Sequence, residues 1–451
     1  MEWSQIMERL HKLLDSGRHG ELRGALMMLS PVDIAQFLET LDPEKMLLLF
    51  RVLPKDMSAD VFSYMTSESK QSLIESIGDN EIRSLINEMF LDDTVDFLEE
   101  LPAGVVKRVL QNTDAQTRDL INQFLQYPEN SAGSIMTIEY MEARVGMTAG
   151  QVMADIRRVG FDKETIYTIY VIDEGRHLKG SVALRKLILY NESVVIDSVM
   201  ETNVASVTTT DDQEKVAGVV RRYDLMAIPV VDKENRLVGI ITADDIMDVI
   251  QEENTEDFEK MAALTPSEDS YLHTSPWKLA INRIPWLILL SIVAIFTGMI
   301  ITSYEDLLKN VDIVLTACIP MLMDTGGNCG AQVSTLIIRG LALNELQPKD
   351  ILRILWKEFR VALLVGAVLS VFTLLRVRFI NGADWPVSLV VALSLYLTVI
   401  IAKAIGCCLP LLAKRVRLDP ALMASPLITT IVDAASLTLY FSIATSMLKL
   451  G

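Results

Sequence analysis

The stretch that decides the fold is Pro320-Met-Leu-Met-Asp324-Thr-Gly326-Gly327-Asn328-Cys-Gly330-Ala-Gln332. It lies inside an apolar segment that is long enough to cross a bilayer. A helix that packed only against lipid would not carry a carboxylate, two amides and three glycines, because polar groups at membrane depth must face protein or a water-filled path. A second lone carboxylate, Asp433, lies in the last apolar segment. Together the two segments predict an ion pathway.

The charges divide the chain into two parts. Residues 276–451 hold 15 Lys/Arg and 10 Asp/Glu, net +5, whereas residues 1–275 hold 26 and 49, net −23. The acidic part argues against nucleic acid as a partner, since binding it requires basic surface. It fits a cationic partner, and the alternative is an acidic face that is simply solvated. At 451 residues the chain has room for about three domains.

The cysteines and the N-terminus indicate where the acidic part resides. All four cysteines lie in the apolar part, at Cys318, Cys329, Cys407 and Cys408. Residues 1–275 therefore offer no disulfide framework and no Cys/His spacing typical of a zinc site. The N-terminal residues are polar and predict no cleavable signal peptide, so we expect the acidic part to stay in the cytosol.

Residues 1–130 predict an all-α domain of short helical hairpins. Apolar residues recur at three- and four-residue steps, and the helices break before prolines. The segments 32–39 and 92–99 resemble each other, which suggests a small superhelix of repeated hairpins. We expect Phe37 and Phe97, at matching places in this repeat, to lie in its core.

Residues 131–253 change to an α/β pattern with an internal repeat. Strand-like runs occur at 167–172, 229–231 and 237–241. The segment 169–180 aligns with 228–239 without a gap, and the openings at 134–136 and 198–200 also match. Two such units resemble a tandem pair of CBS domains, the first at 131–198 and the second at 199–253. A linking helix follows at 254–275.

The last part, 276–451, predicts a transmembrane domain of five spans, near 284–303, 311–340, 360–380, 386–412 and 423–447. Basic residues gather on the flanks that lie inside if the N-terminus is inside. We therefore expect a multi-pass protein of the inner (plasma) membrane with cytoplasmic N-terminal and CBS domains. An odd number of spans places the C-terminus outside.

The membrane carboxylates are candidate ion ligands. A lone Asp at a helix centre costs about 2.5–3.5 kcal/mol on insertion scales, so Asp433 predicts a cation site facing a pore. The alternative is an Asp bonded to nearby hydroxyls. Asp324 either contacts the ion directly, lies at a mouth of the pathway or caps a broken helix. A hydrated Mg²⁺ suits such a path because it prefers oxygen ligands and gives up water reluctantly.

The residues beside Asp324 also bear on the path. Gly326, Gly327 and Gly330 either allow close helix packing or bring backbone carbonyls to a pore. The amides Asn328 and Gln332 favour a hydrated path. We therefore predict a lining made by Asp324, Gly326, Gly327, Asn328 and Gln332.

The acidic part carries carboxylates at helical spacing. Repulsion between like charges is expected along one stripe, formed by Asp245, Asp248, Glu252, Glu256 and Glu259. A second acidic turn spans 92–96. Divalent cations bridging the two faces would remove the repulsion and lock the domains together, which is a plausible metal sensor. The alternative is again a solvated acidic face.

The second CBS unit also carries a ribose-binding pattern, Gly-x-x-Thr-x-x-Asp, at Gly239, Thr242 and Asp245. The first unit has Ala183 and Lys186 at the last two of these places and departs from it. Binding of an adenine nucleotide such as ATP, with Thr242 as a contact, is therefore an open question at this stage.

The whole chain resembles the MgtE family of magnesium channels and transporters. The features that carry the resemblance are the acidic helical domain, the CBS pair, the linking helix, the five spans and a proline before Gly-Gly-Asn, followed by Gln332 and Ile337-Ile338-Arg339-Gly340. The resemblance implies a homodimer with one pore on its two-fold axis and Asp433 as the pore carboxylate. One departure is Ser425, where the family often has Asn before the proline of the last span.

The resemblance also implies cytosolic Mg²⁺ ligands that act as a gate. The positions that match are Asp92, Asp96, Glu214, Asp224, Asp245, Asp248, Glu256, Asp257 and Asp419, with Asp60 as a looser match. We therefore expect a Mg²⁺ channel in the lipid bilayer that closes when cytosolic Mg²⁺ is high. The alternatives are a transporter of Co²⁺ or Ni²⁺ and a membrane-anchored Mg²⁺ sensor without transport. We expect no enzyme, because the chain has no P-loop and no nucleophile–base arrangement.

Overall fold

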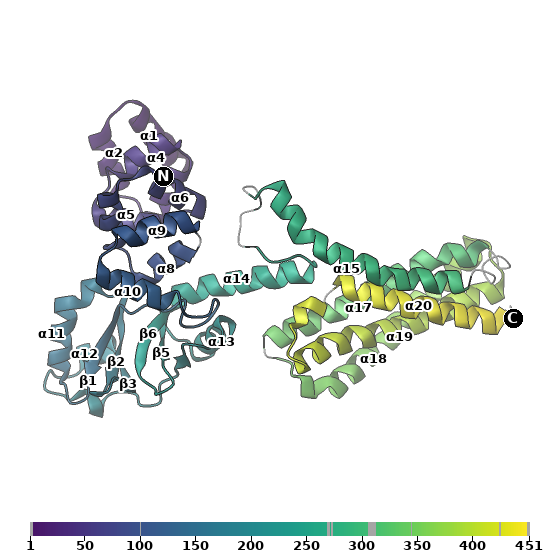
Figure 1. Ribbon diagram of the computed structural model, residues 1–451. Helices are drawn as coiled ribbons and strands as arrows, with labels where there is room; N and C mark the ends of the chain where they lie inside the picture. The colour runs from purple at the N-terminus through teal and green to yellow at the C-terminus, as the bar shows by residue number, and fades with distance from the viewer. Residues whose placement is uncertain are drawn as a thin grey trace. The chain divides into compact units, whose positions relative to one another are not determined.

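The computed structural model describes residues 3–99, 101–267, 271, 274–304, 313–343, 345–423 and 425–448. The chain divides into two compact units, residues 1–250 and 251–451, which are described in turn (Figure 1). The division falls inside one helix, so the boundaries predicted for the N-terminal domain, the CBS pair and the linking helix stay predictions.

The first unit begins with short helices that pack in pairs. Their bounds are α1 (Trp3–Asp15), α2 (His19–Leu26), α3 (Pro31–Glu39), α4 (Pro43–Phe50), α5 (Lys55–Ser63), α6 (Ser67–Ser76), α7 (Asp79–Ile86), α8 (Leu91–Glu99), α9 (Ala103–Asn112) and α10 (Ala115–Phe124). Local sequence starts several of them: the Ser30 hydroxyl accepts from the backbone N–H of Asp33, with Pro31 at the first helical position.

The core of these helices follows the predicted repeat. Phe37 and Phe97 are both buried, as predicted, with 0% and 1% of their surface exposed. The ring of Phe97 meets that of Phe62 edge to face, with centroids 4.8 Å apart. Such aromatic pairs contribute about 0.5–1.5 kcal/mol beyond their buried area. The repeat thus places its aromatic residues where successive hairpins stack.

Two three-stranded sheets complete the first unit, and the predicted strands are confirmed. The first half holds β1 (Tyr140–Arg144), α11 (Ala149–Val159), η1 (Gly160–Asp162), β2 (Thr165–Ile172), β3 (Leu178–Ala183), α12 (Leu184–Leu189) and η2 (Ile196–Ser198). The second holds β4 (Val207–Thr208), α13 (Gln213–Tyr223), β5 (Ala227–Val231), β6 (Leu237–Thr242) and α14 (Ala243–Met261). In each sheet the first pair of strands is parallel and the second antiparallel.

The two sheets repeat each other and contact each other directly. The hydroxyl of Tyr170 on β2 donates to the carbonyl of Ala227 on β5 at 3.1 Å. The turns before β3 and β6 exchange backbone hydrogen bonds, from Leu178 to Asn235 and from Leu237 to Arg176. The sequence repeat therefore corresponds to two similar α/β units that share one interface.

The second unit is a bundle of long helices after the end of α14 (Figure 1). Its elements are α15 (Pro276–Ser303), α17 (Ile313–Ala342), η3 (Pro348–Asp350), α18 (Ile351–Phe379), α19 (Trp385–Arg415), η4 (Pro420–Met423) and α20 (Ser425–Leu448). Helix α19 packs against α17, α18 and α20.

Four helices of the described residues are long and apolar enough to cross a membrane, namely α15, α18, α19 and α20. Helix α17 corresponds to the second predicted span and has 30 residues. Its Asp, Asn and Gly residues make it less apolar than the other four, which is why composition alone does not count it. The helical membrane domain is therefore supported, whereas the count of five spans is not.

Candidate functional site

Helix α17 has two chemically different faces. Asp324, Asn328 and Gln332 follow one another at four-residue steps and are all exposed in the bundle. Residues at this spacing lie one above the other on a helix. The structure thus gathers the polar side chains of the decisive stretch into one stripe, which the bundle of a single chain leaves open.

The glycines of the same stretch lie on the buried side of the helix. A methyl group on Gly326 would meet Thr398 of α19 and Val432 of α20 at 2.8 and 3.0 Å. One on Gly327 would meet Thr429 of α20 at 2.9 Å. Gly326 and Gly327 therefore allow close helix packing, and their predicted role in lining a pore stays a prediction.

Asp433 lies on α20 beside this packing surface. It is half-buried and comes one turn after Thr429, which contacts the glycine face of α17. Helix α20 packs against α17, and Asp433 and Asp324 lie within electrostatic range of each other. The bundle therefore brings together two carboxylates that are 109 positions apart in sequence.

The two threonine hydroxyls near Asp433 are engaged elsewhere. Those of Thr429 and Thr430 both donate to the carbonyl of Pro426 at 2.9 Å. Ser436 is buried, and its hydroxyl has no partner within the described residues. The alternative to an ion site was an Asp bonded to hydroxyls such as those of Thr429, Thr430 or Ser436, and none of these three donates to Asp433 within the described residues.

In the first unit, carboxylates gather between α8, the start of β2 and the start of α14. We call Asp92, Asp93, Glu164, Asp244 and Asp245 the acidic cluster. Asp92 is only 8% exposed, and its Oδ1 has no hydrogen-bond partner within the described part of the chain. Burial, with further repulsion from Asp93, Asp245 and Glu164, holds the pKa of Asp92 well above its usual range. Such a carboxylate requires a proton or a cation.

Two members of the acidic cluster are held by hydroxyl groups. The Ser63 hydroxyl donates to Asp93 at 2.8 Å, and the Thr242 hydroxyl donates to Asp245 at 2.5 Å. Burial nevertheless raises the pKa of both carboxyls. Thr242 is itself buried, so the Thr and Asp of the ribose-binding pattern are oriented toward each other.

Glu164 is the member that sequence reasoning missed. Burial and the charges of Asp245 and Asp93 raise its pKa to about 7. It precedes β2 and follows Lys163, with no helical spacing that links it to the other carboxylates. Only the fold of the first α/β unit brings it to α8 and α14, so no signal in the sequence could have identified it.

The other predicted ligands in the first unit are more open. Asp96 is exposed on α8, one turn after Asp92, and Asp248 is exposed on α14, where burial and Asp244 raise its pKa. Glu214 and Asp224 are exposed at opposite ends of α13. Ten residues of helix separate these two by about 15 Å, so one chain does not join them in a single site.

In the second unit, the end of α14 is tied to the turn before α20. The Lys260 ammonium lies 2.8 Å from a Glu256 oxygen and 2.7 Å from Asp419 Oδ2. Burial, with repulsion from Asp419, raises the pKa of Asp257 to about 6. Three predicted Mg²⁺ ligands, Glu256, Asp257 and Asp419, are thus brought together around a lysine.

An apolar contact also joins the end of α14 to the long helices of the second unit. Met261 packs against a small apolar cluster formed by Ile338 of α17 and Ala421 of η4.

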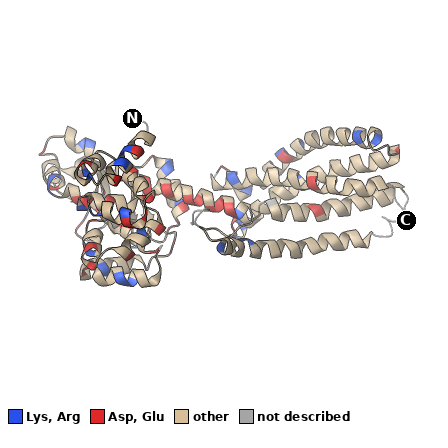
Figure 2. Cartoon of the chain, turned by 90° about the horizontal axis from the view of Figure 1, so that it is seen from above, with Lys and Arg blue, Asp and Glu red and all other residues tan. Residues whose placement is uncertain are grey.

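The carboxylates gather along α14, whereas the long helices of the second unit carry few charges (Figure 2). Within the described residues, however, no three His, Cys, Asp or Glu side chains already form a group able to hold a metal ion.

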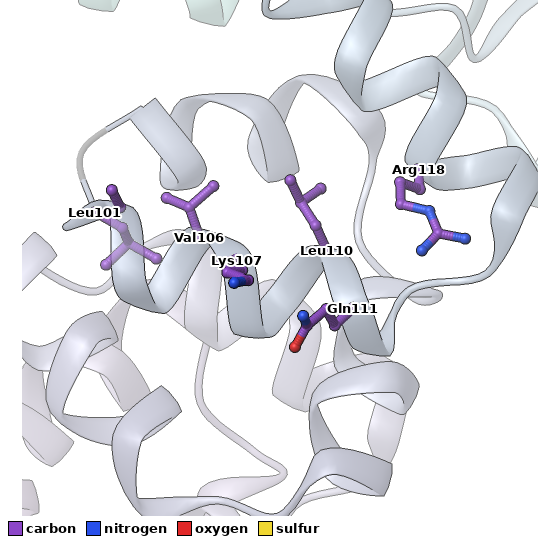
Figure 3. A pocket seen from close by; sticks show the side chains of 7 residues that line it. Leu101, Val106, Lys107, Leu110, Gln111 and Arg118 are labelled. Carbon is purple, nitrogen blue, oxygen red and sulfur yellow. The ribbon is translucent and has the colours of Figure 1, made fainter.

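A hollow on the N-terminal helices has a different character. It is open, measures about 460 Å³ and lies along α9 (Figure 3). Its lining is apolar with basic side chains at the edge, and consists of Leu101, Ala103, Val106, Lys107, Leu110, Gln111 and Arg118. Without a carboxylate in the lining, it does not suit a cation.

A helical membrane unit that carries carboxylates, and that follows two CBS-like units and an acidic helix along the chain, indicates a membrane cation transporter. Family models agree: a divalent cation transporter model named MgtE matches residues 319–443, an MgtE intracellular N domain matches 29–130 and a CBS domain matches 196–252. The chain belongs to the MgtE family, because its relatives match it almost from end to end.

Two of these relatives are named as magnesium transporters MgtE. The Thermus thermophilus protein is 37% identical and the Bacillus subtilis protein 34%, covering 98% and 99% of this chain and 98% of each relative. Two solved structures resemble the first part of the chain. The soluble part of a magnesium transporter has a TM-score of 0.54 at 30% identity, covering 56% of this chain and 99% of that one. The cytosolic domain of the Mg²⁺ channel MgtE in complex with ATP has a TM-score of 0.52 at 36% identity, covering 54% and 99%.

Proposed function

We propose that this protein carries Mg²⁺ across the membrane through a pore that closes when Mg²⁺ binds its cytosolic carboxylates. Transport of Mg²⁺ rests on membership in the family and on the names of relatives that match nearly the whole chain. The protein is accordingly a transporter and not an enzyme. The observation that carries the pore is the meeting of Asp433 with the polar stripe of α17.

The proposed ion pathway rests on the proximity of two carboxylates, Asp433 and Asp324. The two lie within electrostatic range of each other, and the amides of Asn328 and Gln332 continue the exposed stripe that begins at Asp324. Mg²⁺ usually keeps several waters and needs only one or two carboxylates. A hydrated ion between Asp433 and this stripe would satisfy both groups, and no stronger protein cage is required.

The membrane topology that we propose has five spans, with α17 as the second. A helix with an open polar stripe suits a place beside a pore, where neighbouring protein and water satisfy its polar groups. With the N-terminus inside, the basic flanks follow the positive-inside rule, and the C-terminus lies outside.

We further propose a homodimer. Side chains on the helices of both CBS-like units expose apolar surface, including Ile188 (64%), Leu189 (83%) and Met247 (69%). An exposed apolar surface of this kind typically marks an interface. A second copy facing the open stripe of α17 would close the pathway on a two-fold axis.

The gate would respond to Mg²⁺ because the acidic faces repel without it. In the first unit, ions bound at the acidic cluster would hold the N-terminal helices on the CBS-like units. At the other end, ions at Glu256, Asp257 and Asp419 would hold α14 on the pore domain. When Mg²⁺ falls, repulsion would release both, and the linking helix would move from the pore mouth.

Nucleotide is a second, separate ligand that we propose for the CBS-like pair. The support is the hydrogen-bonded Thr242 and Asp245 together with a related cytosolic domain that was solved with ATP. Transport of Co²⁺ or Ni²⁺ is the alternative to this proposal, because the later metals bind most oxygen and nitrogen sites more tightly.

The test is Mg²⁺ flux into proteoliposomes made with the native chain or with Asp433→Asn, at low and high Mg²⁺ on the cytosolic face. Asp384→Asn, which neutralises an exposed carboxylate at the start of α19, is the matched control. We expect flux to require Asp433, to survive the control and to fall at high cytosolic Mg²⁺. Flux that survives Asp433→Asn would move the ion site elsewhere. A folded native chain without any flux would favour the sensor.

A further inference from the structure

The start of α18 carries an exposed basic and aromatic face. Arg353, Lys357 and Arg360 follow each other at four- and three-residue steps, so they lie on the same side of the helix. Lys349, in the 3-10 turn just before α18, is exposed as well. Trp356 lies among them with 60% of its surface exposed. Four cations and an indole thus share one end of one helix.

The aromatic residues of this face are ordered by their contacts. The rings of Trp356 and Phe359 stack, with centroids 5.9 Å apart and an interplanar angle of 22°. The Arg360 guanidinium lies 5.9 Å from the centre of the Trp356 ring. This cation–π contact holds the arginine against the helix, so the charge has a defined position.

Few acidic side chains among the described residues lie near these charges. The first turn of α18 contains no acidic side chain, and cations near a helix N-terminus are unfavourable because the macrodipole is positive there. Glu358 is engaged by Lys403 of α19 at 3.2 Å, and Asp350 accepts from the backbone of Gln347. Among the described residues, the four cations form no ion pair. An anion from outside the chain would relieve them.

The surface beyond the basic residues shows where that anion comes from. The exposed side of α18 continues with large apolar side chains, Leu364 at 72% and Val368 at 71% exposed, and Leu352 at 79% lies beside Arg353. We propose that this face binds the headgroup phosphate of an anionic phospholipid while the acyl chains lie along the apolar side of α18. Arginine suits phosphate because its fork can donate two parallel hydrogen bonds.

Basic flanks also orient membrane proteins, and that role requires only charge on the correct side. A lipid site requires more: the cations must lie on one face, beside ordered aromatic residues, next to lipid-exposed apolar surface. Basic clusters at the ends of membrane helices attract anionic lipid with about 1 kcal/mol per Lys or Arg. The arrangement on α18 meets each of these conditions.

The experiment measures retention of phosphatidylglycerol by native mass spectrometry on the purified full chain. The variant is R353Q/K357Q, and K414Q/R415Q, which removes two exposed cations from the end of α19, is the matched control. R353K/K357R keeps both charges, so it shows whether a loss of lipid in R353Q/K357Q comes from the lost charges or from misfolding. Size-exclusion profiles and protease-determined topology are compared for all four chains.

We expect R353Q/K357Q to bind phosphatidylglycerol about thirtyfold more weakly, from two lost cations. The control and the charge-keeping variant should retain it. Equal retention by R353Q/K357Q and K414Q/R415Q would overturn the proposal and leave the cations as topology signals. Displacement of the lipid by millimolar inorganic phosphate would also overturn it, because the site would then be one for free phosphate.

Discussion

Glu164 makes the acidic cluster sensitive to pH when no divalent cation is bound. Its pKa is raised from 4.5 to about 7 where the N-terminal helices dock on the CBS-like units. A carboxyl with a raised pKa binds its proton more tightly in the docked state, so docking weakens as the pH rises from about 4.5 through 7. Each pH unit of that difference is worth about 1.4 kcal/mol, which sets a ceiling of roughly 3 kcal/mol for Glu164.

The perturbation is Glu164→Gln, which removes the charge and keeps the shape. We expect metal-free docking at pH 8 to strengthen, by at most roughly 3 kcal/mol or about a hundredfold in the docking equilibrium. Its pH dependence between 5.5 and 8 should flatten, and less Mg²⁺ should be required to complete docking. Glu174→Gln is the control, because Glu174 is an exposed carboxylate of the same α/β unit outside the acidic cluster.

The assay is the distance between spin labels on Glu44→Cys and Lys233→Cys in the full chain, with and without Mg²⁺. Both sites are exposed, and of the native cysteines three are buried and one is half-buried, so background labelling can be measured on the parent chain. A metal-free distance distribution that does not change between pH 5.5 and 8 would refute the reasoning. An effect of Glu174→Gln as large as that of Glu164→Gln would refute it as well.

Three further substitutions test the second unit. Lys260→Met removes the ammonium group that bridges Glu256 and Asp419, two of the proposed Mg²⁺ ligands. In flux assays, the cytosolic Mg²⁺ concentration that half-closes the pore should fall about tenfold. An unchanged concentration would contradict the proposed role of these carboxylates. Lys403→Met leaves the half-buried Glu358 without its ion-pair partner, so the free energy of unfolding should fall by about 3 kcal/mol in thermal unfolding. Most of the loss should be regained when Glu358→Leu is added, and a single change without effect would contradict the reasoning. Gly406→Ala brings a methyl group against the backbone carbonyl of Gly330 on α17, so the free energy of unfolding should fall by about 1–3 kcal/mol. Gly298→Ala is the control, because nothing lies within 4 Å of the added methyl group and the free energy of unfolding should not change.

Local patterns in the sequence were sufficient to predict the short helices and the strands of the first unit and their order along the chain. The prolines, caps and apolar spacing predicted the short helices, and the gapless repeat predicted two similar sheets, because helix starts and strand alternation depend on neighbouring residues. Buried Phe37 and Phe97 follow from the same patterns. The span predicted at 311–340 stays a prediction, because the polar residues of α17 lower the apolar signal by which spans are counted.

For the predicted ligands, the sequence indicated which residues are candidates, and the fold decided which of them lie close together. Charge and spacing sufficed to select Asp92, Asp245, Asp433 and the carboxylates of α14. Whether such residues meet depends on packing between elements distant in sequence, as in the contact of α17 with α20 that brings Asp324 near Asp433. Glu214 and Asp224, by contrast, are kept apart by the length of one helix, which is a local property.

The sequence by itself determined the membrane part, the acidic part, the repeated units and the polar stretch at 320–332, since each is a property of composition or local period. Only the tertiary structure decided that the glycines of that stretch face neighbouring helices while its polar side chains form an open stripe. It also decided that Glu164 joins the acidic cluster and that Lys260 lies among carboxylates. The physical reason is that burial and charge repulsion act through space, and no local pattern records which distant side chains the fold brings within a few ångströms.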